Sequence, residues 1–356
     1  MLRQDMSNEG PVMSTEAPVK WHIKDVRWKE VIKRQDYAQL LMTCCIVVGI
    51  LIPTYVCDPR SSEYFIYDAT ISLPPVSPDF EPSVPNWVPV VIPLLELFFT
   101  IVVGEILSSR AQHKSVTDAV ATLLYFLADG VQSFICSLLV SQVTKLVVGR
   151  TRPDFLARCA PEYPANWTLA IGANVDQSLW PCTREYDEVL KDGYQSFPSG
   201  HASISFNITV YASAYLIWCW NMRYPLVVAQ LPMWAQFRQD FRNVAAKLWM
   251  IVMLALAWGI SLSRVIDHQH HISDILGGAF VGIFIALVYS LRAIPRYKRV
   301  LSLEPESVPT EMVNTEIDTL RRVSFGRSSI SKEAPRTDRG MGPEGAVAPA
   351  HASTSV

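Results

Sequence analysis

Histidine, basic and hydroxyl side chains gather in three short segments of the chain, in combinations that suit phosphate chemistry. Arginine presents a planar fork of donors to phosphate oxygens, and lysine adds a point charge. A serine followed by glycine at a helix start leaves backbone N–H groups open to an anion, at the helix end that favours negative charge. These residue types predict a phosphate site in three parts: Lys145 to Pro153, with Arg150 and Arg152; Phe197-Pro198-Ser199-Gly200-His201; and Ser263 to Asp274, with Arg264 and His270.

The spacing within two of these segments indicates which side chains act together. Lys145 and Arg152 are seven residues apart, so they project from one side if the helix continues that far. His270 and Asp274 are four residues apart and share a face of a helical start. We therefore expect the carboxylate to fix the tautomer and orientation of the imidazole.

Long apolar stretches carry these segments. The chain of 356 residues is 50% hydrophobic and 18% charged, and its apolar residues cluster in stretches near the roughly 20 residues that cross a bilayer. The short alternating segments of membrane β-strands are absent. The predicted fold is an all-α integral membrane bundle of six transmembrane helices, at about 37–57, 87–108, 116–149, 201–220, 246–263 and 272–294.

Lysine and arginine set the expected orientation of the bundle. They gather before the first span and after the second, fourth and sixth, segments that an even number of spans places on one side. The positive-inside rule makes that side the cytoplasm, with both termini on it. The three phosphate-binding segments then meet at helix ends on the exoplasmic face. Cations there run against the rule, and a bound anion would account for them.

The flanks of the bundle have simpler patterns. The N-terminus lacks the apolar core of a cleaved signal peptide, so the first span is expected to serve as the targeting signal. Residues 1–36 form a cytoplasmic segment, in which 21–34 fits either an amphipathic surface helix or an ordinary basic flank. Residues 295–356 are rich in Ser, Thr, Pro, Glu and Gly and are expected to be a disordered cytoplasmic tail.

Taken together, the three segments resemble a known family. Lys145-x6-Arg152-Pro153, Pro198-Ser199-Gly200-His201 and Ser263-Arg264-x5-His270-x3-Asp274 are similar to the three motifs of the type 2 phosphatidic acid phosphatase (lipid phosphate phosphatase) superfamily. The resemblance covers about 37–294. The run GRTRPDFLARC resembles the eukaryotic integral-membrane branch rather than the soluble haloperoxidase branch.

The resemblance implies a role for each matching residue. His270 would attack phosphorus and form a phosphohistidine, and Asp274 would hold and polarise it. His201 would protonate the leaving alkoxide and then activate the water that releases phosphate. The phosphoryl oxygens would be held without a metal or other cofactor by Lys145, Arg152, Ser199, Gly200 and Arg264.

The implied function is removal of phosphate from lipids whose tails stay in the bilayer. The main expected substrate is phosphatidic acid. Further expected substrates are lysophosphatidate, diacylglycerol pyrophosphate and sphingoid or ceramide phosphates. The alternatives are a polyprenyl diphosphate phosphatase, a phosphotransferase, or a non-catalytic lipid-binding scaffold. A net charge of −2 gives no indication of a nucleic-acid partner. A homo-oligomer is compatible with the sequence, and the membrane is either the plasma membrane or an endomembrane (Golgi, vacuole or ER), with the site facing outside or lumen.

Several side chains keep two interpretations. His268, His271 and Asp267 flank His270 and could suggest a metal site, although the basic cluster would repel a cation. Arg150 either touches phosphate or marks the membrane boundary. Glu96 and Asp129 lie within spans, where they serve an ion path or, as we favour, hydrogen bonds between helices.

The loop between the third and fourth spans predicts two modifications. Cys159 and Cys182 lie in an exoplasmic loop, so we expect a disulfide rather than two free thiols. Such a bridge would contribute roughly 3 kcal/mol. Asn166 begins an N-glycosylation sequon on the correct side, whereas the sequon at Asn207 lies within a span and should be unmodified.

Overall fold

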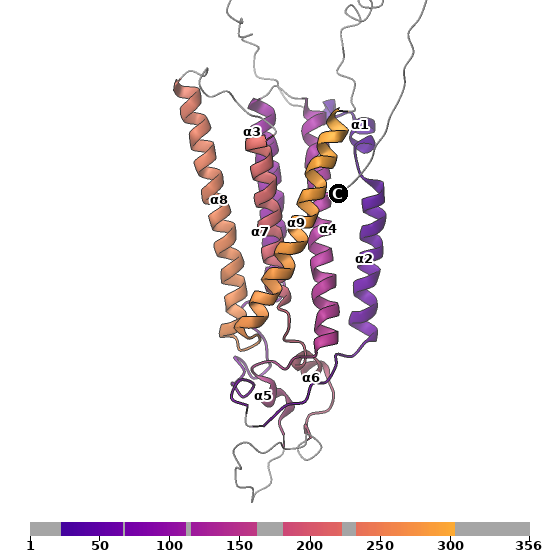
Figure 1. Ribbon diagram of the computed structural model, residues 1–356, viewed down its shortest axis with the longest axis vertical. Helices are drawn as coiled ribbons and strands as arrows, with labels where there is room; N and C mark the ends of the chain where they lie inside the picture. Colours follow the sequence, from indigo (N-terminus) through magenta and orange to yellow (C-terminus); the bar gives the residue numbers. More distant parts are fainter. Residues whose placement is uncertain (1–22, 67, 112–114, 162–180, 223–232, 303–356) are drawn as a thin grey trace, which may run out of the picture. The chain divides into compact units, whose positions relative to one another are not determined.

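The computed structural model describes residues 23–66, 68–111, 115–161, 181–222 and 233–302 (Figure 1). Within these ranges the protein is helical, and the one β-type contact is an isolated bridge between Pro161 and Cys182. The predicted all-helical class is therefore confirmed. Asn166 and the tail from residue 303 onward lie outside the described residues, as do residues 1–22.

Six long helices occupy the predicted positions. Five of them, α3, α4, α7, α8 and α9, are long and apolar enough to cross a membrane, whereas α2 contains a shorter apolar stretch, Tyr37–Ile52. The elements are η1 (Ile23–Asp25), α1 (Trp28–Lys33), α2 (Tyr37–Val56), α3 (Val88–Ala111), α4 (Val116–Val148), α5 (Phe155–Cys159), α6 (Glu188–Gly193), α7 (Gly200–Ile217), the π-helical η3 (Trp218–Met222), α8 (Met233–Ile266) and α9 (Ile272–Ser302).

Two helices extend beyond their predicted spans. Helix α8 begins at Met233, well before residue 246, and α9 continues past residue 294 to Ser302. The added turns hold charged residues such as Arg238 and Arg296, which the apolar pattern excludes. A helix needs no apolar run outside the bilayer, so hydropathy underestimates both helices.

Helix α7 is the central helix of the bundle and packs against α3, α4 and α8. It also meets α9 backbone to backbone. A Cβ atom added to Gly278 would lie 2.3 Å from the Ser199 carbonyl oxygen, and one added to Gly282 would lie 2.1 Å from that of Ser203. Only glycine permits this approach, which brings the start of α9 against the start of α7.

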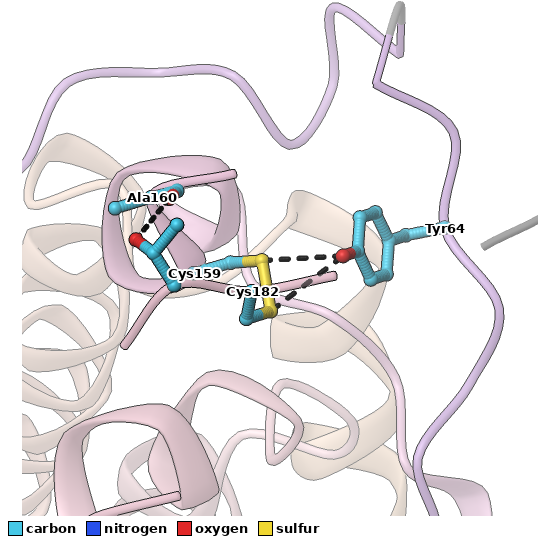
Figure 2. The surroundings of a disulfide bond; sticks show 5 residues. Tyr64, Cys159, Ala160 and Cys182 are labelled. Atoms are coloured by element: carbon cyan, nitrogen blue, oxygen red, sulfur yellow. Dashed lines mark hydrogen bonds between the residues drawn. A yellow bond between two sulfur atoms is a disulfide. The ribbon is translucent and has the colours of Figure 1, made fainter. Parts of the chain in front are cut away.

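The connections at one end of the bundle form a small folded cap, which includes α5 and α6 (Figure 1). Its apolar centre is a cluster of buried side chains that includes Tyr64, Phe155, Leu190 and Tyr194. The predicted disulfide between Cys159 and Cys182 is present. Figure 2 shows the Tyr64 hydroxyl beside both sulfur atoms, at 3.2 and 3.5 Å. We call this end of the bundle the cap end.

The opposite end, which we call the α1 end, is closed by the segment before α2. Val26 and Val31 are buried against Ala121 of α4, and Arg34 pairs with Asp118 at 2.6 Å. Within this segment Trp28–Lys33 forms a short α-helix that packs on α4.

Candidate active site

The start of α7 is the meeting point of the three phosphate-binding segments. Ser199 precedes the helix as its N-cap, and its backbone N–H donates to the Asp274 carbonyl of α9 at 3.0 Å. A Cβ atom added to Gly200 would lie 4.0 Å from Lys145 Nζ. The ammonium group of α4 therefore lies beside the helix end whose free N–H groups favour an anion.

Lys145 and Arg152 do not share a helix face, because the helix does not continue to Arg152 as that arrangement requires. Helix α4 ends at Val148, and Gly149 follows with a φ of 61° while its N–H donates to the Lys145 carbonyl. Glycine is required there, because an added Cβ atom would lie 1.8 Å from the Arg60 carbonyl oxygen. The chain turns away, and Arg152 approaches the site from the loop.

Arg152 is held in place by Asp192 of α6. Its Nε donates to the Asp192 carbonyl at 2.9 Å and its Nη2 to the carboxylate at 2.6 Å. Arg158 bonds the other carboxylate oxygen at 3.0 Å and forms a buried, two-pronged pair with Asp154. Burial raises the pKa of Asp192, but the charges of Arg152 and Arg158 lower it further, so the pKa lies below its usual value.

Sequence reasoning missed this acidic anchor. The four-residue spacing of Asp154 and Arg158 was a signal for their pair. No local pattern indicates Asp192, because it reaches Arg152 only through the folding of the cap.

His270 is oriented by a backbone carbonyl rather than by Asp274. Its Nδ1–H donates to the Ser196 carbonyl at 2.6 Å, whereas the distance from Nδ1 to Asp274 Oδ2 is 3.9 Å. The expected direct carboxylate bond is therefore replaced, because the backbone before α7 passes closer to the ring. The result is a single tautomer with a free lone pair on Nε2.

The surroundings of His270 also determine its charge. Burial lowers its pKa to about 4; the positive charges of Arg152 and Lys145 act in the same direction, and contact with Asp274 opposes them. The imidazole is therefore neutral at pH 7, which is the state that a nucleophile requires.

Asp274 organises the residues around His270 instead. Its carboxylate accepts from the Ser196 hydroxyl at 2.6 Å, from the His271 backbone N–H at 2.8 Å and from Arg150 at 2.6 Å. Ser196 thus joins the two predicted partners, with its carbonyl on His270 and its hydroxyl on Asp274. Arg150, whose role the sequence left open, binds the carboxylate.

Arg264 and His201 bring further donors to the same region. Arg264 is fully buried and donates to the Val84 carbonyl at 2.5 Å, yet its Nε has no hydrogen-bond partner. His201 Nε2 is also buried without a partner, within electrostatic reach of Arg264, His270 and Lys145.

The residues that suggested a metal site each form hydrogen bonds with a different group. Asp267 accepts from the Ser83 N–H and hydroxyl at 3.0 and 2.6 Å, and His268 bonds the Pro74 carbonyl at 2.7 Å. His271 contacts Asp274 at 3.2 Å. In the part of the chain that the structure describes, His, Cys, Asp and Glu form no group of three that could hold a metal ion.

Residues 121–296, which include all three segments, match the family model of the PAP2 superfamily. Over these residues, just under half of its length, the chain is similar to the PAP2 superfamily.

Among curated proteins, the chain is 36% identical to a "Probable diacylglycerol pyrophosphate phosphatase 1" of Schizosaccharomyces pombe, over 46% of this chain and 51% of that protein. It is 26% identical to a "Putative phosphatidate phosphatase" of Drosophila melanogaster, over 70% of this chain and 65% of that protein. It is 28% identical to "Diacylglycerol pyrophosphate phosphatase 1" of Saccharomyces cerevisiae, over 83% of this chain and 92% of that protein. The chain thus spans about half the length of the first relative. No solved structure matches.

Proposed function

We propose that this protein is a lipid phosphate phosphohydrolase that works through a phosphohistidine on His270. The observation that carries the proposal is a buried, neutral imidazole with one oriented tautomer, placed among Lys145, Arg152 and Arg264. Names of relatives support phosphatidate and diacylglycerol pyrophosphate as substrates.

The residues divide the reaction into two transfers. In the first, His270 Nε2 forms a bond to phosphorus while the bond to the lipid oxygen breaks, and His201 gives that oxygen a proton. In the second, His201 takes a proton from water, whose oxygen displaces His270 and releases inorganic phosphate. Asp274, 3.9 Å from the ring, stabilises the positive charge that develops on His270.

Charge on the transferred group is met by the protein's own donors. Lys145, Arg264 and the N–H groups at the start of α7 would stabilise the phosphoryl oxygens in the transition state. Arg152 adds a positive charge while Asp192 holds its guanidinium. This set of cations supports metal-independent turnover, because it replaces the charge that a magnesium ion would supply.

The membrane arrangement is part of the same proposal. We take α2 as the sixth crossing, which places the α1 end in the cytoplasm and the cap end outside or in a lumen. Residues 37–294 then form the catalytic unit, between cytoplasmic segments 1–36 and 295–356. Site residues lie at helix ends, where a phosphate headgroup would reach them while its acyl tails stay in the bilayer.

A phosphate-release assay on the purified protein tests the function. Phosphatidate, diacylglycerol pyrophosphate, lysophosphatidate, ceramide phosphate and a polyprenyl diphosphate are compared in detergent micelles, with EDTA present. Release from at least one lipid monophosphate is expected. Turnover that EDTA abolishes and magnesium restores would contradict the metal-free mechanism, and lipid binding without any release would favour the scaffold alternative.

A further inference from the structure

A line of polar side chains runs between α4 and α7 from the α1 end to the candidate active site. On α4 these residues recur every four positions, and on α7 they do the same in the opposite direction. Residues four apart share one face of a helix, so both rows face the same interface. We call this line the polar seam; its members are Asp129, Ser133, Ser137 and Ser141 of α4, and Ser203, Asn207 and Tyr211 of α7 together with the N-cap residue Ser199.

Three pairs of the polar seam are joined by hydrogen bonds. The Tyr211 hydroxyl donates to Asp129 at 2.9 Å. The Asn207 amide donates to the Ser133 hydroxyl at 3.0 Å. Each pair is one helical turn further along α4 and one turn back along α7, as antiparallel helices require.

The third pair, Ser137 with Ser203, has its hydroxyl oxygens 2.6 Å apart. The same register places Ser141 opposite Ser199 in the next pair. Both side chains are buried, at 1% and 0% exposure, and neither hydroxyl has a hydrogen-bond partner. The regular pairing of polar groups therefore ends where the seam reaches the start of α7.

This unpaired position adjoins the phosphate-binding groups. Ser199 immediately precedes Gly200, and Lys145 lies one turn beyond Ser141 on the same face of α4. A buried hydroxyl without a partner is costly, and a hydroxyl that donates to a charged oxygen makes a strong hydrogen bond. Two such hydroxyls beside an ammonium group suit an anion with several oxygens.

We propose that Ser141 is a further phosphate-binding residue, whose hydroxyl acts with that of Ser199 on one oxygen of the substrate phosphate. The inference rests on the proposed function and adds to it one more residue that binds the phosphate. Ser141 precedes the first of the three phosphate-binding segments, so the spacing of those segments does not indicate it.

Orthovanadate binding tests the inference apart from turnover, because vanadate presents phosphate-like oxygens. Its affinity for the purified full chain is obtained from the concentration-dependent rise of the thermal unfolding midpoint. Ser141→Ala should weaken vanadate about tenfold or more, as expected for loss of a hydrogen bond to a charged group. If Ser141→Ala does not fold, Ser141→Cys, with similar volume and a weaker donor, is expected to weaken vanadate severalfold.

Ser205→Ala is the matched control. Ser205 lies on α7 and, like Ser141, is 1% exposed and without a hydrogen-bond partner, but it is outside the polar seam. Its variant should bind vanadate like the wild type. Ser137→Ala should lower the unfolding midpoint by loss of the bond to Ser203 and leave vanadate affinity within about twofold.

The outcomes separate the inference from the proposed function. Wild-type phosphate release with equal vanadate affinity in Ser141→Ala and Ser205→Ala overturns the inference alone. Vanadate binding that Ser141→Ala weakens, without release from any lipid phosphate, keeps the phosphate site and overturns the function. A wild-type protein that neither binds vanadate nor releases phosphate overturns both.

Discussion

Two clusters of charged residues lie at opposite ends of the same bundle and differ in how their hydrogen-bonding groups are used. At the α1 end, Asp36 pairs with Arg292 at 2.9 Å and with Arg296 at 2.8 Å. The two oxygens of Asp129 accept from Gln39 at 2.8 Å and from Tyr211 at 2.9 Å. Asp36 is thus paired with basic groups and Asp129 with neutral donors from other helices, as the hydrogen-bonding interpretation of Asp129 predicted, whereas Glu96 Oε1 is buried without a partner.

At the cap end, donors exceed the acceptors that the protein offers them. Arg264 Nε, His201 Nε2 and the Ser199 hydroxyl are buried without partners. None of the ion pairs among the described residues includes Lys145. A cluster whose charges are paired holds helices together, whereas one with spare donors is suited to an anion.

The largest expected effect is the loss of the nucleophile at the cap end. His270→Ala should reduce phosphate release to background and abolish any trapped phosphoenzyme, because the proposed mechanism forms the phosphorus bond at His270 Nε2. His268→Ala is the matched control, since His268 bonds the Pro74 carbonyl instead. Acid-quenched labelling with a radioactive lipid phosphate measures both. A phosphoenzyme in His270→Ala would assign the nucleophile elsewhere.

The second effect depends on the leaving group. His201→Ala should slow release from phosphatidate by about 10²–10⁴-fold, the usual contribution of general acid catalysis. Release from p-nitrophenyl phosphate should fall much less, because that leaving group needs little protonation. Initial rates on both substrates provide the measurement. Equal losses on the two would remove His201 from the proton-donor role.

The third effect belongs to the α1 end and concerns stability. Asp36→Asn should lower the free energy of unfolding by about 1 kcal/mol, because the half-exposed Arg292 and Arg296 lose a charged partner but are still solvated. Vanadate affinity should stay within about twofold. Thermal unfolding with and without vanadate checks both, and a large loss of vanadate affinity would mean that the two clusters are coupled.

The smallest expected change is the charge of His270 between pH 7 and pH 5. Burial lowers its pKa to about 4, so the ring should remain neutral at pH 5, where an ordinary histidine is mostly protonated. Its contribution to folding stability is present above about pH 6.5 and is lost as pH falls through about 4, since the unfolded chain binds the proton first. NMR of labelled histidine side chains checks the titration. A midpoint near 6.5 would place the ring in a more solvated setting than the structure shows.

The sequence by itself determined the class of the protein. Apolar stretches of bilayer length dictate helices, because a spanning backbone must satisfy its hydrogen bonds internally. The types of the site residues, and the pairing of Cys159 with Cys182 in the structure, were also accessible from local pattern. Each of these conclusions rests on chemistry that acts along a short stretch of chain.

The tertiary structure alone decided how the site is assembled. Gly149 turns the chain away from α4 because the Arg60 carbonyl blocks any Cβ atom there, so Arg152 reaches the site through Asp192. The Ser196 carbonyl takes the place expected for Asp274 because α7 and α9 approach through glycines. Contacts of this kind join residues far apart in the chain, and helical spacing carries no information about which distant backbone atom lies nearest.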